Sequence, residues 1–366
     1  MSGLDLFSLL LDNSSDLFYR FSNADGKVWI MPAQNMRVAM NLYQPSGNKG
    51  KLLKALFPWF HAIPLVRGMI HAEKLYCKLN EKLDRLLCSL FHENSIEYAI
   101  FGGTPCVHQK ITIQVSKGPR ILGYCKITGC NEVATLFRSE ADLLEWLKKQ
   151  KMIGVPLCVY CGELIEGVFI FVQSTEKTQQ SKVPHKWNRL HELFLDELQR
   201  NTRQNILFEK SDYYRTLQEL LLHLDWLPEY ANRKVIKNAI DQIFNAYRDK
   251  IVNFSAYHAD FTPWNMFVEK GRLFVFDWEY ARLTYPPLLD RYHFFMQTAI
   301  FEQHWQEKEI IAFLQSSDAK WVNKEMLTLY LLDIISRFTI REKGRVGGDI
   351  ARSMKIWNNI LIYLRK

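Results

Sequence analysis

Four polar side chains within residues 257–279 have the types and the spacing that phosphoryl transfer requires. His258, Asp260 and Asn265 share one short loop, and Asp277 leaves a predicted strand of apolar residues. One carboxylate can accept the proton of an attacking hydroxyl, while an amide oxygen and a second carboxylate can hold Mg²⁺ on the phosphates. We therefore expect Asp260 to be the base and Asn265 and Asp277 to bind Mg²⁺. His258 is expected to hold the loop through hydrogen bonds.

This stretch follows the pattern HxDxxxxN, then a hydrophobic strand, then D. It resembles the aminoglycoside phosphotransferase and choline kinase family, and DFTPWN looks like the loop of the bacterial members. The resemblance covers about residues 96–300 and implies a kinase-like fold with ATP and Mg²⁺ as cofactors. Trp278 and Glu279 stand where protein kinases have Phe-Gly after the metal-binding aspartate. This difference favours the resembled family over the protein kinases.

Two charged side chains earlier in the chain are predicted to act on the nucleotide. Lys126 lies in GYCKI on an otherwise apolar strand, where a buried ammonium group needs an anionic partner. We expect Lys126 to neutralise the α/β-phosphates, although a lysine facing solvent would fit the same pattern. The resemblance implies an acid on the following helix, and Glu140 is favoured for this place over its neighbours Glu132 and Glu145.

Backbone groups are also expected to bind the nucleotide. Gly102 and Gly103, in FGGTPCVHQK, predict a turn that lets the backbone approach the phosphates closely, although an ordinary hairpin turn has the same composition. The end of the last strand of the small lobe is expected to be a hinge that offers backbone groups to adenine. The predicted hinge residues are Phe171, Val172, Gln173 and Ser174.

The elements that must position these residues suggest an α+β, bilobal, protein-kinase-like fold. Residues 96–175 alternate as strands do and predict a small antiparallel-sheet lobe in the order β-β-β-α-β-β. Residues 176–366 predict a larger, mostly helical lobe. Its first helices are expected at 187–200, 211–224 and 232–250. Asp290 would open a later helix, where the helix dipole favours a negative charge.

Residues 1–95 fall outside the resemblance and predict an N-terminal extension of short strands and helices. Strands are expected at Lys27–Met31 and Arg37–Tyr43, and a long amphipathic helix from Ala72 to about residue 90. The stretch Leu52–Ile70 mixes aromatic and basic residues. An alternative role for it is weak contact with a membrane surface.

The composition is that of a globular protein, because 48% of the 366 residues are hydrophobic and 23% are charged. The net charge of +8 suits an anionic substrate, a nucleotide or an acidic membrane surface. No arginine-rich tract or nucleic-acid motif is present, so a nucleic-acid partner is not expected. Seven cysteines without framework spacing and a poor secretion signal predict a cytoplasmic protein.

A zinc site is the alternative chemistry that the cysteines raise. Cys158 and Cys161 form a lone CxxC, and Cys125 and Cys130 could complete four ligands. Residues three apart in a strand point to opposite faces, which suits neither a zinc knuckle nor a redox turn. A metal site at these cysteines is therefore disfavoured.

The residues together predict transfer of the γ-phosphoryl group of ATP to a hydroxyl of a small molecule or saccharide. The chain is basic and the segment ARLTYPPLL is not acidic, so a polycationic aminoglycoside is disfavoured. A sugar, a glycolipid or cell-envelope intermediate, or an amino alcohol is preferred. The alternative is a catalytically inactive kinase-like protein that acts as a scaffold.

Overall fold

The computed structural model describes residues 6–45, 47–103, 106 and 108–365. The chain divides into two compact units. The first consists of Met1–Lys149, Ile153–Lys182 and Val268–Phe274, and the second of Gln150–Met152, Val183–Phe267 and Val275–Lys366. The predicted division at residues 95 and 175 stays a prediction, since the first unit takes in both the N-terminal segment and the small lobe.

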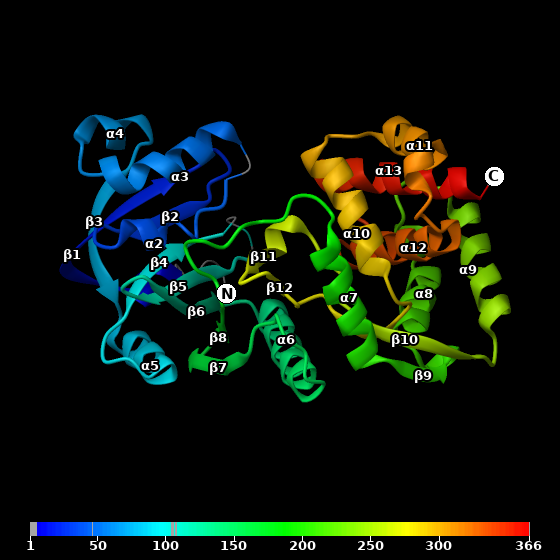
Figure 1. The fold of residues 1–366 in the computed structure, drawn as a ribbon, viewed down its shortest axis with the longest axis horizontal. Coiled ribbons are helices and arrows are strands. Elements are labelled where there is room, and N and C mark those ends of the chain that lie inside the picture. The colour runs from blue at the N-terminus through cyan, green and yellow to red at the C-terminus, as the bar shows by residue number, and fades with distance from the viewer. Residues whose placement is uncertain (1–5, 46, 104–105, 107, 366) are drawn as a thin grey trace. The chain divides into compact units, whose positions relative to one another are not determined.

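The first unit is built on one antiparallel sheet of eight strands in the order β3-β1-β2-β4-β5-β6-β8-β7 (Figure 1). The strands are β1 (Leu11–Ser22), β2 (Val28–Pro32), β3 (Glu73–Leu79), β4 (Glu97–Phe101), β5 (Ile111–Lys117), β6 (Arg120–Thr128), β7 (Cys158–Ile165) and β8 (Val168–Ser174). With α6 (Asn131–Lys149) between β6 and β7, the predicted β-β-β-α-β-β order is confirmed.

The N-terminal segment extends this sheet, and two predictions for it were wrong. Glu73–Leu79 is strand β3 rather than the start of a helix, because its odd-numbered positions face inward and Cys77 and Leu79 are buried. The helix begins only at α5 (Glu81–Phe91), where the side chain of Asn80 caps it. The strand expected at Arg37–Tyr43 is instead the short helix α2 (Met36–Ala39).

Helices cover both faces of the sheet. On one face, α1 (Leu6–Leu10) and α5 share a core cluster with inward residues of the strands, such as Ile100, Ile113 and Cys125. On the other face, α2 and α3 (Asn48–Phe60) enclose a second cluster around Phe57. Helix α6 also lies on the sheet, where Phe137 meets Phe171 of β8 with ring centroids 6.0 Å apart. Helix α4 (Pro64–Met69) has no buried residue.

The second unit is mostly helical, as predicted, and the expected helices 187–200, 211–224 and 232–250 correspond to α7, α8 and α9. Its longer helices are α7 (Arg189–Thr202), α8 (Asp212–Leu222), α9 (Arg233–Tyr247), α10 (Leu289–Gln297), α11 (Glu307–Gln315), α12 (Lys324–Arg341) and α13 (Gly348–Leu364). All of them except α7 contribute side chains to one large core that contains Trp357 and Tyr330. In the described residues, no helix is long and apolar enough to cross a membrane.

Short strands carry the chain between these helices. Strand β10 (Ile251–Tyr257) pairs with β9 (Gln204–Leu207) on one side and with β13 (Arg282–Tyr285) on the other. Strands β11 (Met266–Glu269) and β12 (Arg272–Val275) form a hairpin. The loops after β10 and after β12 hold the residues for which chemistry was predicted.

Candidate active site

The loop that follows β10 is held by a buried carboxylate on α10. Asp290 accepts the backbone N–H groups of His258 at 2.9 Å and of Ala259 at 3.0 Å. Ala259 has a φ of 71°, a left-handed conformation that costs a non-glycine residue free energy unless its surroundings impose it. Burial raises the pKa of Asp290 to about 7, although both backbone donors lower it. A favourable interaction with the helix dipole is therefore not the only role of Asp290, because its carboxylate also fixes the loop.

His258 joins the two loops of the site. The side chain is fully buried, its Nε2 lies 3.0 Å from the carbonyl oxygen of Phe276, and its Nδ1 accepts the backbone N–H of Asp260 at 3.1 Å. These partners require a neutral ring with the proton on Nε2. Burial lowers the pKa of His258 to about 4, which is consistent with that state. The hydrogen-bonding expected of His258 is present in this geometry.

The carboxylate of Asp260 is held on both oxygens. Nδ2 of Asn265 donates to Oδ2 at 2.7 Å and to the backbone carbonyl of Asp260 at 3.0 Å, while Nε2 of His293 lies 3.1 Å from Oδ1. Burial raises the pKa of Asp260 most, but the hydrogen bond from His293 and the electrostatic interactions with His293 and His258 together outweigh it and leave the pKa below its ordinary value. His293, on α10, is the clearest site residue that the sequence analysis missed.

Asp277 lies close to this group. Its negative charge raises the pKa of both Asp260 and His258, so Asp277 lies within electrostatic reach of both side chains. Asp277 has a φ of 69°, again a left-handed conformation at a non-glycine residue. The two carboxylates and the Asn265 amide thus come together from loops that precede and follow the β11–β12 hairpin.

A buried hydrogen-bond network around Arg337 and Asp333 of α12 also holds this loop. Arg337 donates to the carbonyl oxygen of Ala259 and, at 2.7 Å, to Asp333. Asp333 also accepts the hydroxyls of Tyr257 and Tyr285, each at 3.0 Å. A buried charge pair with every partner satisfied gives a specific geometry to the chain that it contacts. The network therefore fixes the point where β10 ends and the loop begins.

In the first unit, the structure joins Lys126 to Glu140. The Lys126 Nζ lies 2.8 Å from Glu140 Oε2, and the side chains are 10% and 0% exposed. The two alternatives to Glu140 have other contacts: Glu132 accepts from the thiol of Cys130, and Glu145 forms an exposed pair with Lys148. The partner that the resemblance implied is the one in contact, while its role toward a nucleotide stays a prediction.

The glycine turn follows β4 and requires glycine at its second position. Gly103 has a φ of 66°, and a Cβ there would lie 2.6 Å from the carbonyl oxygen of Lys110. Gly102 is held by its N–H to Val28 and by its carbonyl oxygen, which accepts the side chain of Gln109. Residues 104, 105 and 107 of this predicted phosphate loop lie outside the described residues.

The predicted hinge is not free to offer backbone groups along most of its length. Phe171, Val172 and Gln173 are paired with β6 on one side and β7 on the other. Ser174 also exchanges hydrogen bonds with Leu157. Their backbone donors and acceptors are used within the sheet, so an adenine contact there is not supported. The residues after Ser174 are the place where the backbone leaves this pairing.

A row of side chains with buried polar atoms crosses the sheet beside Lys126, and the sequence analysis singled out only Gln173 among them. Gln114, Tyr124 and Gln173 are directly paired on neighbouring strands, so they share one face of the sheet. Each has a buried polar atom without a hydrogen-bond partner, namely Gln114 Oε1, Tyr124 Oη and Gln173 Oε1. Tyr124 precedes Lys126 by two residues, and strand alternation places the two on the same face. That alternation was the signal available in the sequence.

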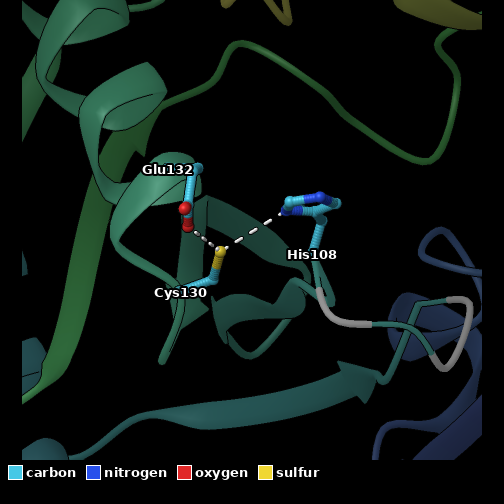
Figure 2. A group of neighbouring side chains, drawn as sticks. All are labelled: His108, Cys130 and Glu132. Carbon is cyan, nitrogen blue, oxygen red and sulfur yellow. Dashed lines mark hydrogen bonds between the residues drawn. The ribbon is translucent and has the colours of Figure 1, made fainter. Parts of the chain in front are cut away.

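One other group of possible metal ligands lies in the described part of the first unit (Figure 2). The Sγ of Cys130 lies 3.4 Å from His108 Nδ1 and 2.9 Å from Glu132 Oε2. This group links the loop after the glycine turn to the start of α6. It differs from the four-cysteine set considered above, because Cys158 and Cys161 are not part of it.

A cavity of about 390 Å³ lies in the second unit against α10. Trp187, Phe294 and Trp321 are among the aromatic residues that line it, and Arg291 lies over the rings of Trp187 and Trp321. None of the described residues that line it is acidic. Phe261, next to Asp260 in the chain, has ring centroids 6.4 Å from both Trp187 and Phe294. The wall of the cavity therefore packs directly against the loop that carries Asp260.

Comparison with known families agrees with this geometry. The sequence profile of the phosphotransferase enzyme family matches residues 124–319, which is more than half of the chain. The match includes Lys126, Glu140 and the loop residues from 258 to 277. A search of curated proteins gave no match.

Several solved structures resemble this chain at low sequence identity. A thermostable mutant of the aminoglycoside phosphotransferase APH(4)-Ia, complexed with AMP-PNP and hygromycin B, has a TM-score of 0.50 and 12% identity over 77% of this chain and 98% of its own. The streptomycin–ATP complex of APH(2")-IIa has a TM-score of 0.46 and 15% identity over 78% and 97%. A putative fructosamine-3-kinase from Haemophilus somnus has a TM-score of 0.44 and 14% identity over 76% and 96%. The likeness to APH(4)-Ia confirms the predicted α+β kinase-like fold.

Proposed function

We propose that this chain, which belongs to the phosphotransferase enzyme family, transfers the γ-phosphoryl group of ATP to a hydroxyl of a saccharide-like small molecule. The observation that carries the proposal is the fixed carboxylate of Asp260. Asn265 and His293 hold its two oxygens, and Asp277 lies nearby. Phosphoryl transfer is catalysed mainly by positioning the reactants, and this requires a base held in one orientation beside a second carboxylate.

In the proposed reaction, Asp260 orients the acceptor hydroxyl and receives its proton. The acceptor oxygen forms a bond to the γ-phosphorus, and the bond from the γ-phosphorus to the β,γ-bridging oxygen breaks, so ADP leaves with that electron pair. Because the transition state is loose, Asp260 needs correct orientation more than a raised pKa. Its lowered pKa keeps the carboxylate ionised and able to accept the proton.

Asn265 and Asp277 suit Mg²⁺ by their chemistry. Mg²⁺ prefers oxygen ligands, and the Asn265 amide uses its nitrogen toward Asp260, which leaves the amide oxygen to a cation. Asp277 supplies a carboxylate from the loop after β12. Bound there with the nucleotide, Mg²⁺ would neutralise charge that develops on the phosphate oxygens.

Lys126 and the face of the sheet around it are the proposed nucleotide contacts of the first unit. Glu140 orients the Lys126 ammonium group, which would bind the α/β-phosphates. Tyr124 offers an aromatic ring on the same face, and it is paired in the sheet with Gln173; the Tyr124 hydroxyl and the Gln173 Oε1 are both buried without a hydrogen-bond partner. Aromatic rings stack on nucleobases with little dependence on sequence or base type. Gly102 and Gly103 would let the backbone of this turn approach the phosphates closely.

The cavity against α10 is the proposed acceptor site, and its lining indicates the class of acceptor. Trp187, Trp321 and Phe294 provide flat apolar surfaces of the kind that stack on sugar rings. Arg291 and Lys186 give the lining positive charge without any acidic neighbour among its described residues. A polycationic acceptor would be repelled there, whereas a neutral or anionic saccharide would be attracted.

A transfer assay with radiolabelled ATP tests this proposal. Neutral and acidic saccharides, an amino alcohol and an aminoglycoside are offered as acceptors, and Arg291→Gln is the matched variant. Transfer to an acidic saccharide that falls in Arg291→Gln through a raised KM supports the assignment. Preferred transfer to the aminoglycoside contradicts it. If millimolar Mg-ATP gives no thermal stabilisation, the inactive scaffold becomes the better explanation.

A further inference from the structure

The N-terminal part of the first unit contains a long stretch without acidic residues. Between residues 26 and 72 the chain has no Asp or Glu, although the whole protein has 39 of them. The same stretch has six cations: Lys27, Arg37, Lys49, Lys51, Lys54 and Arg67. This local excess of positive charge includes all of α3 and α4, and it attracts an anionic surface.

Helices α3 and α4, drawn in blue in Figure 1, also carry an exposed apolar face. Seven of the eighteen exposed large hydrophobic side chains in the described chain fall within residues 52–69. Trp59 is 68% exposed, and Leu65 and Met69 are each 76% exposed. We call these seven residues the α3–α4 face: Leu52, Leu56, Trp59, Phe60, Ile63, Leu65 and Met69.

The helices that carry the α3–α4 face are packed against the core and bonded to each other. Leu52, Leu56 and Trp59 recur at helical spacing on the outer side of α3, while Phe57 on the opposite side is fully buried in the core. The guanidinium of Arg67 donates to the carbonyl oxygens of residues 61 and 62 at the end of α3, which ties α4 to α3. The seven apolar side chains of the α3–α4 face therefore remain exposed although the core beneath α3 is complete.

A basic cavity of about 290 Å³ adjoins this face. Arg37, Lys54 and Trp59 line it, and Arg37 lies over the Trp59 ring, 5.8 Å from its centroid. No carboxylate in the described chain pairs with Arg37 or Lys54, and none lines the cavity. Burial lowers the pKa of Lys177 to about 8, and the nearby positive charge of Lys54 contributes to this shift.

We propose that the α3–α4 face binds the surface of an anionic phospholipid bilayer, with a lipid phosphate in the cavity lined by Arg37 and Lys54. Apolar and aromatic side chains among cations, with no anions, are the composition of helices that lie in a membrane interface. A second copy of this chain would present the same positive charge and be repelled. Nucleic acid would match the charge but leave Trp59, Leu65 and Met69 without apolar contact.

Vesicle co-sedimentation of the full chain tests the proposal without nucleotide or acceptor. The expected result is binding to vesicles of phosphatidylcholine mixed with phosphatidylglycerol, and much weaker binding to phosphatidylcholine alone. The double variant Trp59→Glu/Leu65→Glu is expected to bind at least about tenfold more weakly. Leu222→Glu is the matched control, because Leu222 is 77% exposed on α8, far from these residues in the chain, and it should bind like wild type.

A second variant tests the cavity. Arg37→Gln/Lys54→Gln should lose most of the preference for anionic vesicles while keeping the circular dichroism spectrum of wild type. Unchanged binding in either double variant overturns the proposal. Stabilisation by inorganic phosphate with no vesicle binding, or a dimer in sedimentation velocity that Trp59→Glu/Leu65→Glu dissociates, would also overturn it. Asp260→Ala should bind vesicles like wild type, so this test is independent of phosphoryl transfer.

Discussion

Nε2 of His293 lies 3.1 Å from Oδ1 of Asp260, so a helix and a loop jointly orient the proposed base. His293 is 2% exposed, and Tyr330 lies 3.4 Å from its Nδ1. Burial lowers the pKa of His293, which keeps the ring neutral and its Nε2 proton directed at Asp260. His293 therefore acts as a positioning residue for Asp260.

Replacing His293 tests this relationship. In His293→Phe the carboxylate loses one of its two anchors, and kcat should fall by about tenfold to a hundredfold with little change in KM for ATP. His293→Gln, which keeps a donor near the position of Nε2, should recover part of the loss. Equal kcat values in His293→Phe and wild type would show that Asp260 does not depend on this contact.

The buried pair between Lys126 and Glu140 should govern both nucleotide binding and stability. Lys126→Met removes the ammonium partner of a fully buried carboxylate, so the free energy of unfolding should fall by about 3–5 kcal/mol. Stabilisation by Mg-ATP should also decrease. Lys148→Met breaks the exposed pair with Glu145, which should cost less than about 1 kcal/mol and leave nucleotide binding unchanged. Full Mg-ATP stabilisation of Lys126→Met would remove Lys126 from the phosphate site.

His258 should make the protein sensitive to acid. Burial lowers its folded-state pKa to about 4, below the value of an exposed histidine, so the unfolded chain binds the proton first as pH falls. Stability from this group is therefore complete above the unfolded pKa and is lost toward the folded pKa. Between about pH 7 and about pH 5 the loss should be about 2 kcal/mol.

Urea unfolding of His258→Gln at these two pH values measures that contribution. The variant should be less stable than wild type near neutrality but lose less stability on acidification. His191→Gln is a useful comparison, because burial also lowers the pKa of His191 to about 4, while its Nδ1 accepts the backbone N–H of Asn188 at the start of α7. Parallel stability curves for wild type and His258→Gln would contradict the neutral, buried state of His258.

Asp277 should control the response to Mg²⁺. In Asp277→Asn the proposed site loses a negative charge. Nucleotide should still bind, while the affinity for Mg²⁺, measured through the additional stabilisation that Mg²⁺ gives, should fall at least about tenfold. Thermal shift with ATP, with and without Mg²⁺, separates the two effects. Asp241→Asn, at an exposed helical aspartate that pairs with Lys237, is the control and should respond like wild type. An unchanged Mg²⁺ response in Asp277→Asn would place the metal elsewhere.

Local sequence patterns were sufficient to predict much of the secondary structure of the small lobe. The alternation in β5 and β6 and the helical spacing in α6 identified these elements, and the face of α6 that meets the sheet carries Glu140 to Lys126. The strand β3 was missed because Leu75, Tyr76 and Leu79 also fit a helical repeat, and only pairing with β1 decides between the two. Helix α2 is short, so propensity and periodicity carried little information about it.

The missed site residues depend on contacts that a sequence pattern does not contain. His293 is 33 residues from Asp260, on a helix that is buried on most sides, so no amphipathic face marks the residue that reaches the loop. The hinge role of Phe171 and Val172 stays a prediction, and their pairing on both sides in the interior strand β8 was not foreseen because a strand's position in a sheet follows from its partners. Asp290 was assigned to a helix dipole although it binds two loop amides.

The most direct test of the account is the fate of the γ-phosphoryl group in Asp260→Asn. The variant keeps the size of the side chain and one of its two acceptor oxygens, so it should fold and bind Mg-ATP as wild type does. With radiolabelled ATP and an acceptor that wild type phosphorylates, we predict that transfer falls by at least about a hundredfold. Transfer at the wild-type rate by a folded Asp260→Asn protein would contradict the central claim.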